Sequence, residues 1–216
     1  MNADRVVDNL PMFPLGSVVL PGGQLPLHIF EPRYRQLVQD LLASDEGSLE
    51  FGTVMIERGR EVGGGDQRAT VGTIVTVVDV RVSDDGRYGV MAVGVERLRV
   101  IEWLPDDPYP KASIERWPDE ADPPGSTPVD ALAIERLREQ LEECFTAMRA
   151  LGDAVPDTLP PSSTEAQRAL YELASWSPIS VADLHAVLAA PSTAQRFDVL
   201  AGALDDAAAV LKFRGS

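Results

Sequence analysis

Side chains that could support catalysis or binding gather in one short stretch of the sequence, between Leu27 and Arg35. His28 and Glu31 are the pair that a small-ligand receptor or a hydrolase could use as acid and base in a pocket. Together with Phe30, Arg33 and Tyr34, the same two residues could instead line a groove for a peptide. The types and spacing of these residues leave both kinds of site open.

Each of these residues also has a purely structural interpretation, which we prefer. His28 alternates with Leu27 and Ile29 and should face the opposite side of a strand, as a polar position beside the start of a helix. Glu31 favours the amino terminus of that helix through the helix dipole, and it can pair with a nearby arginine. The stretch then supplies a capped helix that fills a barrel.

Other patterns of catalytic residues are missing from the sequence. The glycine cluster Gly63–Gly65 precedes Asp66 and no lysine, so it does not have the composition of a phosphate-binding loop. No G-x-S-x-G turn occurs, and the second histidine, His185, lies among apolar residues at helical spacing. Two histidines and the single Cys144 are a poor supply of metal ligands. We therefore predict no catalytic residue, no metal and no cofactor.

The elements that position these side chains are mainly strands between Leu10 and Trp117. Prolines on both sides of Gly22 indicate edge or bulged strands, and Pro32 begins a helix with apolar residues on one face. Asp84-Asp85-Gly86-Arg87 is typical of a tight hairpin. About seven short strands with one helix suggest a closed or nearly closed barrel. The later strands are expected at Leu49–Glu57, Thr70–Val82, Tyr88–Val95, Arg97–Leu104 and Lys111–Trp117.

The second half of the sequence has helical periodicity. An acidic, proline-rich stretch at 118–128 resembles a linker, which gives a β-rich domain at 1–117 and a helical bundle at 129–216. The apolar stripe from Ile134 to Leu151 predicts a long helix. Ser162-Ser163-Thr164-Glu165 has the spacing of a capping box, Ser180 can cap a short helix, and Ser192 can cap the last one. Four helices are expected.

Several motifs resemble one known family. They are Leu25-Pro26-Leu27-His28-Ile29-Phe30-Glu31-Pro32-Arg33-Tyr34-Arg35, then Val71-Gly72-Thr73, then Asp85-Gly86-Arg87, and Gly94-Val95-Glu96-Arg97-Leu98-Arg99-Val100. The sequence resembles the amino-terminal substrate-binding domain of Lon-type proteases, in the free-standing form without the ATPase and protease domains. That family usually has phenylalanine where Leu98 stands. The resemblance implies an α+β fold, a PUA-like β pseudo-barrel followed by a helical bundle, and non-catalytic recognition of polypeptides.

Composition excludes several other classes of protein. The hydrophobic content of 44% and the charged content of 25% are close to globular averages. A formal charge of −15 disfavours binding to nucleic acid and to acidic membranes. PUA-like barrels elsewhere do bind RNA, which leaves RNA as a minor alternative. The start of the chain is polar, the apolar runs are too short to span a membrane, and one cysteine fits a reducing compartment. We expect a cytoplasmic protein.

The predicted partners are unfolded polypeptides or specific client proteins, which the protein could hand to a protease or a chaperone. The alternative is a small-ligand-binding protein or hydrolase with a pocket near His28 and Glu31. A deep enclosed pocket would favour that alternative, whereas a broad apolar groove would favour peptide binding. Trp103, Trp117 and Trp176 either pack inside the protein or offer exposed aromatic surface to a client. Oligomeric state and client identity are not predicted.

Overall fold

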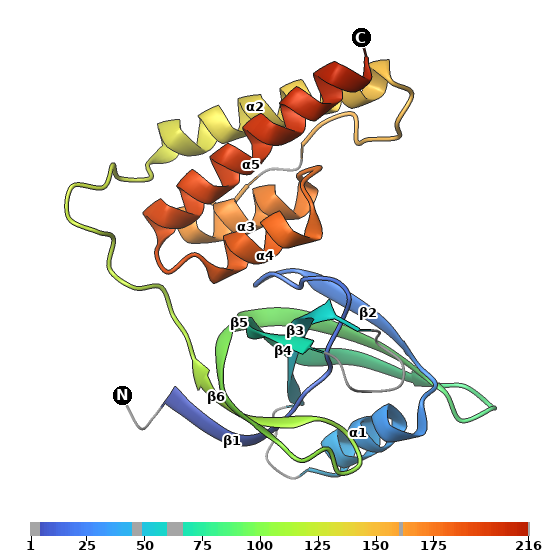
Figure 1. Cartoon of the computed structure of the whole chain (residues 1–216). Coiled ribbons are helices and arrows are strands. Elements are labelled where there is room, and N and C mark those ends of the chain that lie inside the picture. The colour runs from blue at the N-terminus through green and yellow to red at the C-terminus, as the bar shows by residue number, and fades with distance from the viewer. Residues whose placement is uncertain (1–4, 45–48, 60–66, 160–161, 216) are drawn as a thin grey trace. The chain divides into compact units, whose positions relative to one another are not determined.

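The computed structural model describes residues 5–44, 49–59, 67–159 and 162–215 (Figure 1). The chain divides into two compact units, Met1–Pro118 and Asp119–Ser216. Within the described residues, all six strands and one helix belong to the first unit, and the other four helices belong to the second. The division falls at the amino-terminal end of the stretch that the sequence suggested as a linker.

An antiparallel sheet of six strands forms the first unit. The strand order is β1-β6-β5-β4-β3, and β2 pairs with β5 outside this path. The first part of β5, from Tyr88 to Val93, lies between β2 and β4, and its later part pairs with β6. The strands are β1 (Val6–Pro11), β2 (Gln24–Ile29), β3 (Glu50–Arg58), β4 (Gln67–Val82), β5 (Tyr88–Leu104) and β6 (Lys111–Arg116).

A short segment after β1 bridges the two ends of this sheet. The backbone N–H of Phe13 donates to the carbonyl of Gly52 at 2.8 Å, and that of Leu15 donates to the carbonyl of Val54 at 2.9 Å. Ile56 returns a bond to the carbonyl of Leu15 at 2.7 Å. The sheet is therefore an open pseudo-barrel that this segment completes. The fully closed barrel allowed by the sequence analysis is wrong, because β1 and β3 do not form a ladder with each other.

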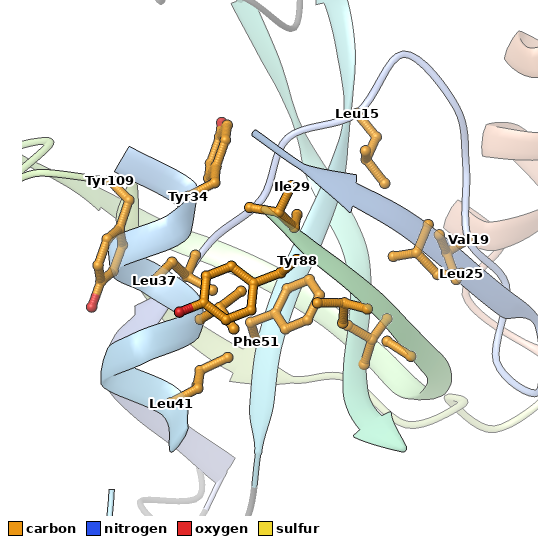
Figure 2. Close-up of a cluster of buried hydrophobic side chains, with 14 residues drawn as sticks. Leu15, Val19, Leu25, Ile29, Tyr34, Leu37, Leu41, Phe51, Tyr88 and Tyr109 are labelled. Carbon is orange, nitrogen blue, oxygen red and sulfur yellow. The ribbon is translucent and has the colours of Figure 1, made fainter. Parts of the chain in front are cut away.

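Helix α1 (Pro32–Ala43) covers one face of this sheet. Its first residue is Pro32, as predicted, and the predicted stripe of Tyr34, Leu37, Val38 and Leu41 is buried. Leu37 and Leu41 reach toward Phe51 and Tyr88 in the strands (Figure 2). The core cluster comprises Leu15, Val19, Leu25, Ile29, Tyr34, Leu37, Val38, Leu41, Phe51, Val75, Tyr88, Val90, Ala92 and Tyr109.

The solvent side of α1 is also anchored to the loop between β5 and β6. The hydroxyl of Tyr109 donates to Oδ2 of Asp40 at 2.8 Å, while Nε2 of Gln36 donates to Oδ1 of the same carboxylate at 2.7 Å. Burial, together with the hydrogen bond and the charge of Asp40, raises the pKa of the Tyr109 hydroxyl above its usual range. Tyr109 therefore remains a hydrogen-bond donor throughout the physiological pH range.

Two glycines explain parts of the sequence pattern. Gly86 adopts a φ of 75° in the tight turn between β4 and β5, so the predicted hairpin is confirmed. Gly94 lies against the turn that leads into β2: its N–H donates to the carbonyl of Gly23 at 2.9 Å, and its own carbonyl accepts from Gly22 at 2.8 Å. A Cβ on Gly94 would stand 2.3 Å from the carbonyl oxygen of Leu20, so only glycine fits there.

The second unit contains the four expected helices within the described residues. They are α2 (Ala131–Ala150), α3 (Ala166–Trp176), α4 (Val181–Ala189) and α5 (Thr193–Arg214). Ser180 and Ser192 cap α4 and α5 as predicted, each accepting from the backbone three residues later. The capping box at Ser162 to Glu165 is wrong, because Glu165 is the N-cap of α3 and makes no side-chain cap bond. No helix in the described ranges is long and apolar enough to cross a membrane.

The strongest polar contact in the second unit involves the proposed linker. Arg196 on α5 is 0% exposed, and its two terminal nitrogens donate to the two carboxylate oxygens of Asp119, both at 2.7 Å. The guanidinium also lies 4.4 Å from the ring centroid of Tyr171. Asp122 accepts from the backbone N–H of Ala194 at 2.8 Å, at the start of α5. The first residues of the 118–128 stretch are thus bonded to the helices that follow it.

Candidate functional site

A partly open hollow of about 180 Å³ lies in the first unit where β2 leads into α1. Seven of its nine lining residues are apolar or aromatic, and the other two supply an imidazole and a carboxylate, so polar and apolar atoms both face the hollow. Two segments of the chain contribute the lining residues, namely the bridging segment after β1 and the junction between β2 and α1. The lining residues are Phe13, Leu15, Pro26, Leu27, His28, Ile29, Phe30, Glu31 and Tyr34.

A pair of stacked rings supports the hollow from inside. Phe13 and Tyr34 stack with their centroids 4.0 Å apart and their planes 26° apart. Tyr34 is almost fully buried. Leu15 of the bridging segment and Ile29 of β2 lie in the same region and are buried as well (Figure 2). Phe13 is partly buried and Tyr34 is buried, and because packed rings have few alternative arrangements, this pair should keep its position when a ligand is absent.

The charged residues at the start of α1 pair with one another. Nε of Arg33 donates to Oε2 of Glu31 at 3.1 Å, and the guanidinium of Arg33 lies 4.5 Å from the ring centroid of Tyr34. Glu31 occupies the N-cap position but makes no side-chain cap bond. The predicted pairing of Glu31 with an arginine is therefore present, while its carboxylate does not cap the helix. The ion pair neutralises the carboxylate at the rim of the hollow.

The alternation of β2 exposes the outer rim. Leu25 and Ile29 are buried, whereas Pro26 and His28 are exposed, so His28 faces away from the core as the alternation predicted. Phe30 follows the strand and is 53% exposed. Pro32 then fixes the backbone at the first helical position, where the strand conformation ends and α1 begins. The result is an exposed phenylalanine beside an apolar hollow.

The structure brings four of the five candidate residues to this hollow. His28, Phe30, Glu31 and Tyr34 line it, and Arg33 lies beside it, in contact with the Tyr34 ring and with Glu31. The sequence analysis missed Phe13 and Leu15, which belong to the bridging segment. No local pattern shows that this segment crosses to β3, so only the tertiary fold reveals their place.

The size and lining of the hollow indicate what it can hold. Small-molecule sites in proteins are usually about 300–1,000 Å³, whereas an apolar cavity of about 150 Å³ holds one benzene ring. At about 180 Å³, the hollow fits one large apolar side chain. The small-ligand or hydrolase alternative is therefore not favoured. Within the described residues, no group of three or more potential metal ligands comes together.

The tryptophans contribute less to binding surface than the sequence allowed. Trp117 is buried, with the guanidinium groups of Arg97 and Arg99 each 4.0 Å from its ring centroid. Trp103 lies under the guanidinium of Arg68 at 4.4 Å. Of the three, Trp176 is the most exposed, at 44%. Two of the three rings therefore have structural roles.

Comparison with known proteins identifies similar sequences and folds. The family model described as the ATP-dependent protease La (LON) substrate-binding domain matches residues 9–206. The Lon protease of Anaeromyxobacter dehalogenans is 29% identical over 167 residues, which make up 76% of this chain and 18% of that protein. The Lon protease of Desulfovibrio desulfuricans is 33% identical over 155 residues, which make up 71% of this chain and 17% of that protein. The chain thus spans less than a fifth of these relatives.

Solved structures show the same fold. A Lon N-terminal domain protein from Xanthomonas campestris superposes with a TM-score of 0.65 at 26% identity, covering 91% of this chain and 98% of that one. The N-terminal domain of the Mycobacterium avium complex Lon protease gives a TM-score of 0.56 at 16% identity, covering 92% and 98%. The predicted α+β fold, a pseudo-barrel followed by a helical bundle, is confirmed.

Proposed function

The chain belongs to the family of Lon protease substrate-binding domains, and from that premise we propose that it binds unfolded polypeptides without cutting them. The observation that carries the proposal is the hollow beside β2, which has room for one apolar side chain and an exposed phenylalanine at its rim. The clients would be damaged proteins or specific unfolded proteins, passed on to a protease or a chaperone.

Such a site can distinguish unfolded from native chains by burial alone. Large apolar side chains are mostly buried in folded proteins, and unfolding exposes them. Transferring one Leu or Phe side chain from water into the hollow would contribute about 1.5–3 kcal/mol. This amount is small against the cost of association, so we expect weak binding to any one segment. A client that exposes many such segments would be held more strongly.

Electrostatics narrows the range of partners. A formal charge of −15 over 216 residues repels phosphate backbones, and Arg33 beside the hollow is already paired with Glu31. Polypeptides that are neutral or basic fit this charge best. We therefore propose neither a nucleic acid nor a membrane surface as the partner.

The experiment compares one test protein in its native form and in a reduced, carboxymethylated form. Fluorescence anisotropy should show saturable binding of the unfolded form only. Phe30→Ser should weaken that binding about 5- to 30-fold, the equivalent of one or two kcal/mol, because it removes an aromatic contact at the rim. Ile101→Ser is the matched control, since Ile101 is 50% exposed in the same unit and does not line the hollow.

Two results would overturn the proposed function. One is equal binding of the native and the unfolded form, since burial would then not decide recognition. The other is equal loss of affinity in Phe30→Ser and Ile101→Ser, since general surface hydrophobicity would then explain binding without the hollow.

A further inference from the structure

Strand β2 forms an edge of the sheet beside the hollow. Its six residues pair with β5 alone among the described strands, in continuous register from Gln24 opposite Val93 to Ile29 opposite Tyr88. An antiparallel strand directs the backbone groups of alternate residues to opposite sides. Half of the residues in β2 therefore bond to β5, and the other half direct their N–H and C=O groups to the outer edge.

Two bonds at the start of the strand establish which half faces outward. The N–H of Gly94 donates to the carbonyl of Gly23 at 2.9 Å, and the carbonyl of Gly94 accepts from the N–H of Gly22 at 2.8 Å, so Gly94 directs both of its backbone groups toward the start of β2. Following the register in steps of two, the residues that bond to β5 are Leu25, Leu27 and Ile29. The backbone groups of Gln24, Pro26 and His28 then face the outer edge.

The position of Pro26 agrees with this assignment. Proline has no N–H, and within sheets it is found where that group would face away from the neighbouring strand. Pro26 therefore removes no hydrogen bond between β2 and β5. It leaves the outer edge of this part of β2 with the carbonyl of Pro26 and with both the N–H and the carbonyl of His28.

The hollow opens on the same part of the strand. Its lining includes Pro26, Leu27, His28 and Ile29 of β2, and Phe13 and Leu15 of the bridging segment. A chain laid along the outer edge would therefore reach the hollow directly. Backbone groups and an apolar recess side by side are the two components of recognition by strand addition, in which the edge supplies affinity and the recess supplies selectivity.

We propose that the client binds as an added β-strand, with its backbone bonded to the outer edge of β2 around His28 and one apolar side chain in the hollow. This inference rests on the proposed function and specifies its substrate as an extended segment. A residue bonded to His28 directs its side chain to the exposed face, as His28 does. Its neighbours direct theirs to the face of Leu27 and Ile29, which line the hollow together with Phe13 and Leu15.

A helical client does not fit this edge. The backbone groups of a helix bond within the helix, so they cannot satisfy the N–H of His28. An extended chain offers its carbonyl and N–H groups at the spacing of a strand. The segments that bind should therefore be extended, with an apolar residue next to the one that bonds to His28.

The first experiment replaces His28 by proline and, as the matched control, by alanine. His28→Pro removes the outward N–H without removing a bond to β5, whereas His28→Ala removes the imidazole and keeps the N–H. The affinity for the reduced, carboxymethylated protein should fall about 5- to 30-fold further in His28→Pro than in His28→Ala, because a client carbonyl loses its donor. Equal affinities of the two variants would overturn strand addition.

The second experiment uses the wild-type protein alone, so it tests the inference even if His28→Pro does not fold. Amide hydrogen exchange in the wild-type protein should show that the unfolded client slows exchange at His28, while Leu27, already bonded to β5, changes little. Binding without protection at His28 would refute strand addition and leave the proposed function standing. Absence of binding would refute the proposed function itself. Protection at His28 without any client, in a dimer that dissociates on dilution, would mean that β2 pairs with a second copy and would overturn the inference.

Discussion

Replacing Asp119 by alanine is expected to lower the free energy of unfolding of the helical unit by about 3–5 kcal/mol, the cost of breaking a buried ion pair by removing one partner. Arg196 has no exposed surface and donates to both oxygens of Asp119. In Asp119→Ala its charge would remain buried with only the Ala190 carbonyl, at 3.2 Å, and the Tyr171 ring beside it. This is the largest effect that we expect from any single substitution in the chain.

Urea unfolding followed by far-ultraviolet circular dichroism measures this effect. Asp122→Ala is the matched control, because Asp122 belongs to the same stretch and bonds a backbone N–H at the start of α5 rather than a buried cation. Its loss should cost about 0.5–2 kcal/mol, as for other helix caps. Equal free energies of unfolding for the two variants would show that the buried Asp119–Arg196 pair does not stabilise the helical unit more than an ordinary helix cap.

Replacing Gly94 by alanine is expected to have the second largest effect, a loss of about 3 kcal/mol from the first unit, since overpacking and two strained hydrogen bonds add together. The new Cβ would stand 2.3 Å from the Leu20 carbonyl oxygen, so the turn before β2 would have to move. In that turn, the N–H of Gly22 donates to the carbonyl of Gly94, and the carbonyl of Gly23 accepts from the N–H of Gly94. Because β2 follows it directly, client affinity should fall as well.

Gly89→Ala supplies the control on the same strand. A Cβ on Gly89 meets one atom at 4.0 Å, the Cβ of Arg81, which is an ordinary contact. Thermal unfolding should place Gly89→Ala close to the wild type and Gly94→Ala well below it. If both variants melted at the wild-type temperature, the turn would not depend on the close approach of β5.

Local patterns predicted the elements whose causes are local. Pro32 and the apolar stripe gave α1, Asp85-Gly86 gave the hairpin, and Ser180 and Ser192 gave the starts of α4 and α5. Strand β1 was missed beyond its last residues because its middle is exposed and has no apolar alternation. The two strands predicted at Tyr88–Val95 and Arg97–Leu104 are the single strand β5, since one residue between them does not interrupt the ladder.

Long-range contacts escaped the sequence analysis. Asp119 and Arg196 are 77 residues apart, so the composition of the proposed linker gave no sign of its bond to α5. The bridging of Phe13 and Leu15 to β3 likewise left no periodic signal. The β2–α1 junction was identified as a candidate site because its polar and aromatic residues are neighbours in sequence. Phe13 and Leu15 also line the hollow, and they come from a segment that only the fold brings there.

The central claim, that the hollow beside β2 holds an apolar side chain of an unfolded polypeptide, is tested most directly by photo-crosslinking from position 30. A benzophenone amino acid in place of Phe30 would be irradiated with the native or the carboxymethylated form of one protein, with the same label at Ile101 as the control. We expect crosslinks from position 30 to the unfolded form alone, at residues next to apolar side chains in extended segments. Crosslinks of equal yield to both forms, or from both positions, would contradict the claim.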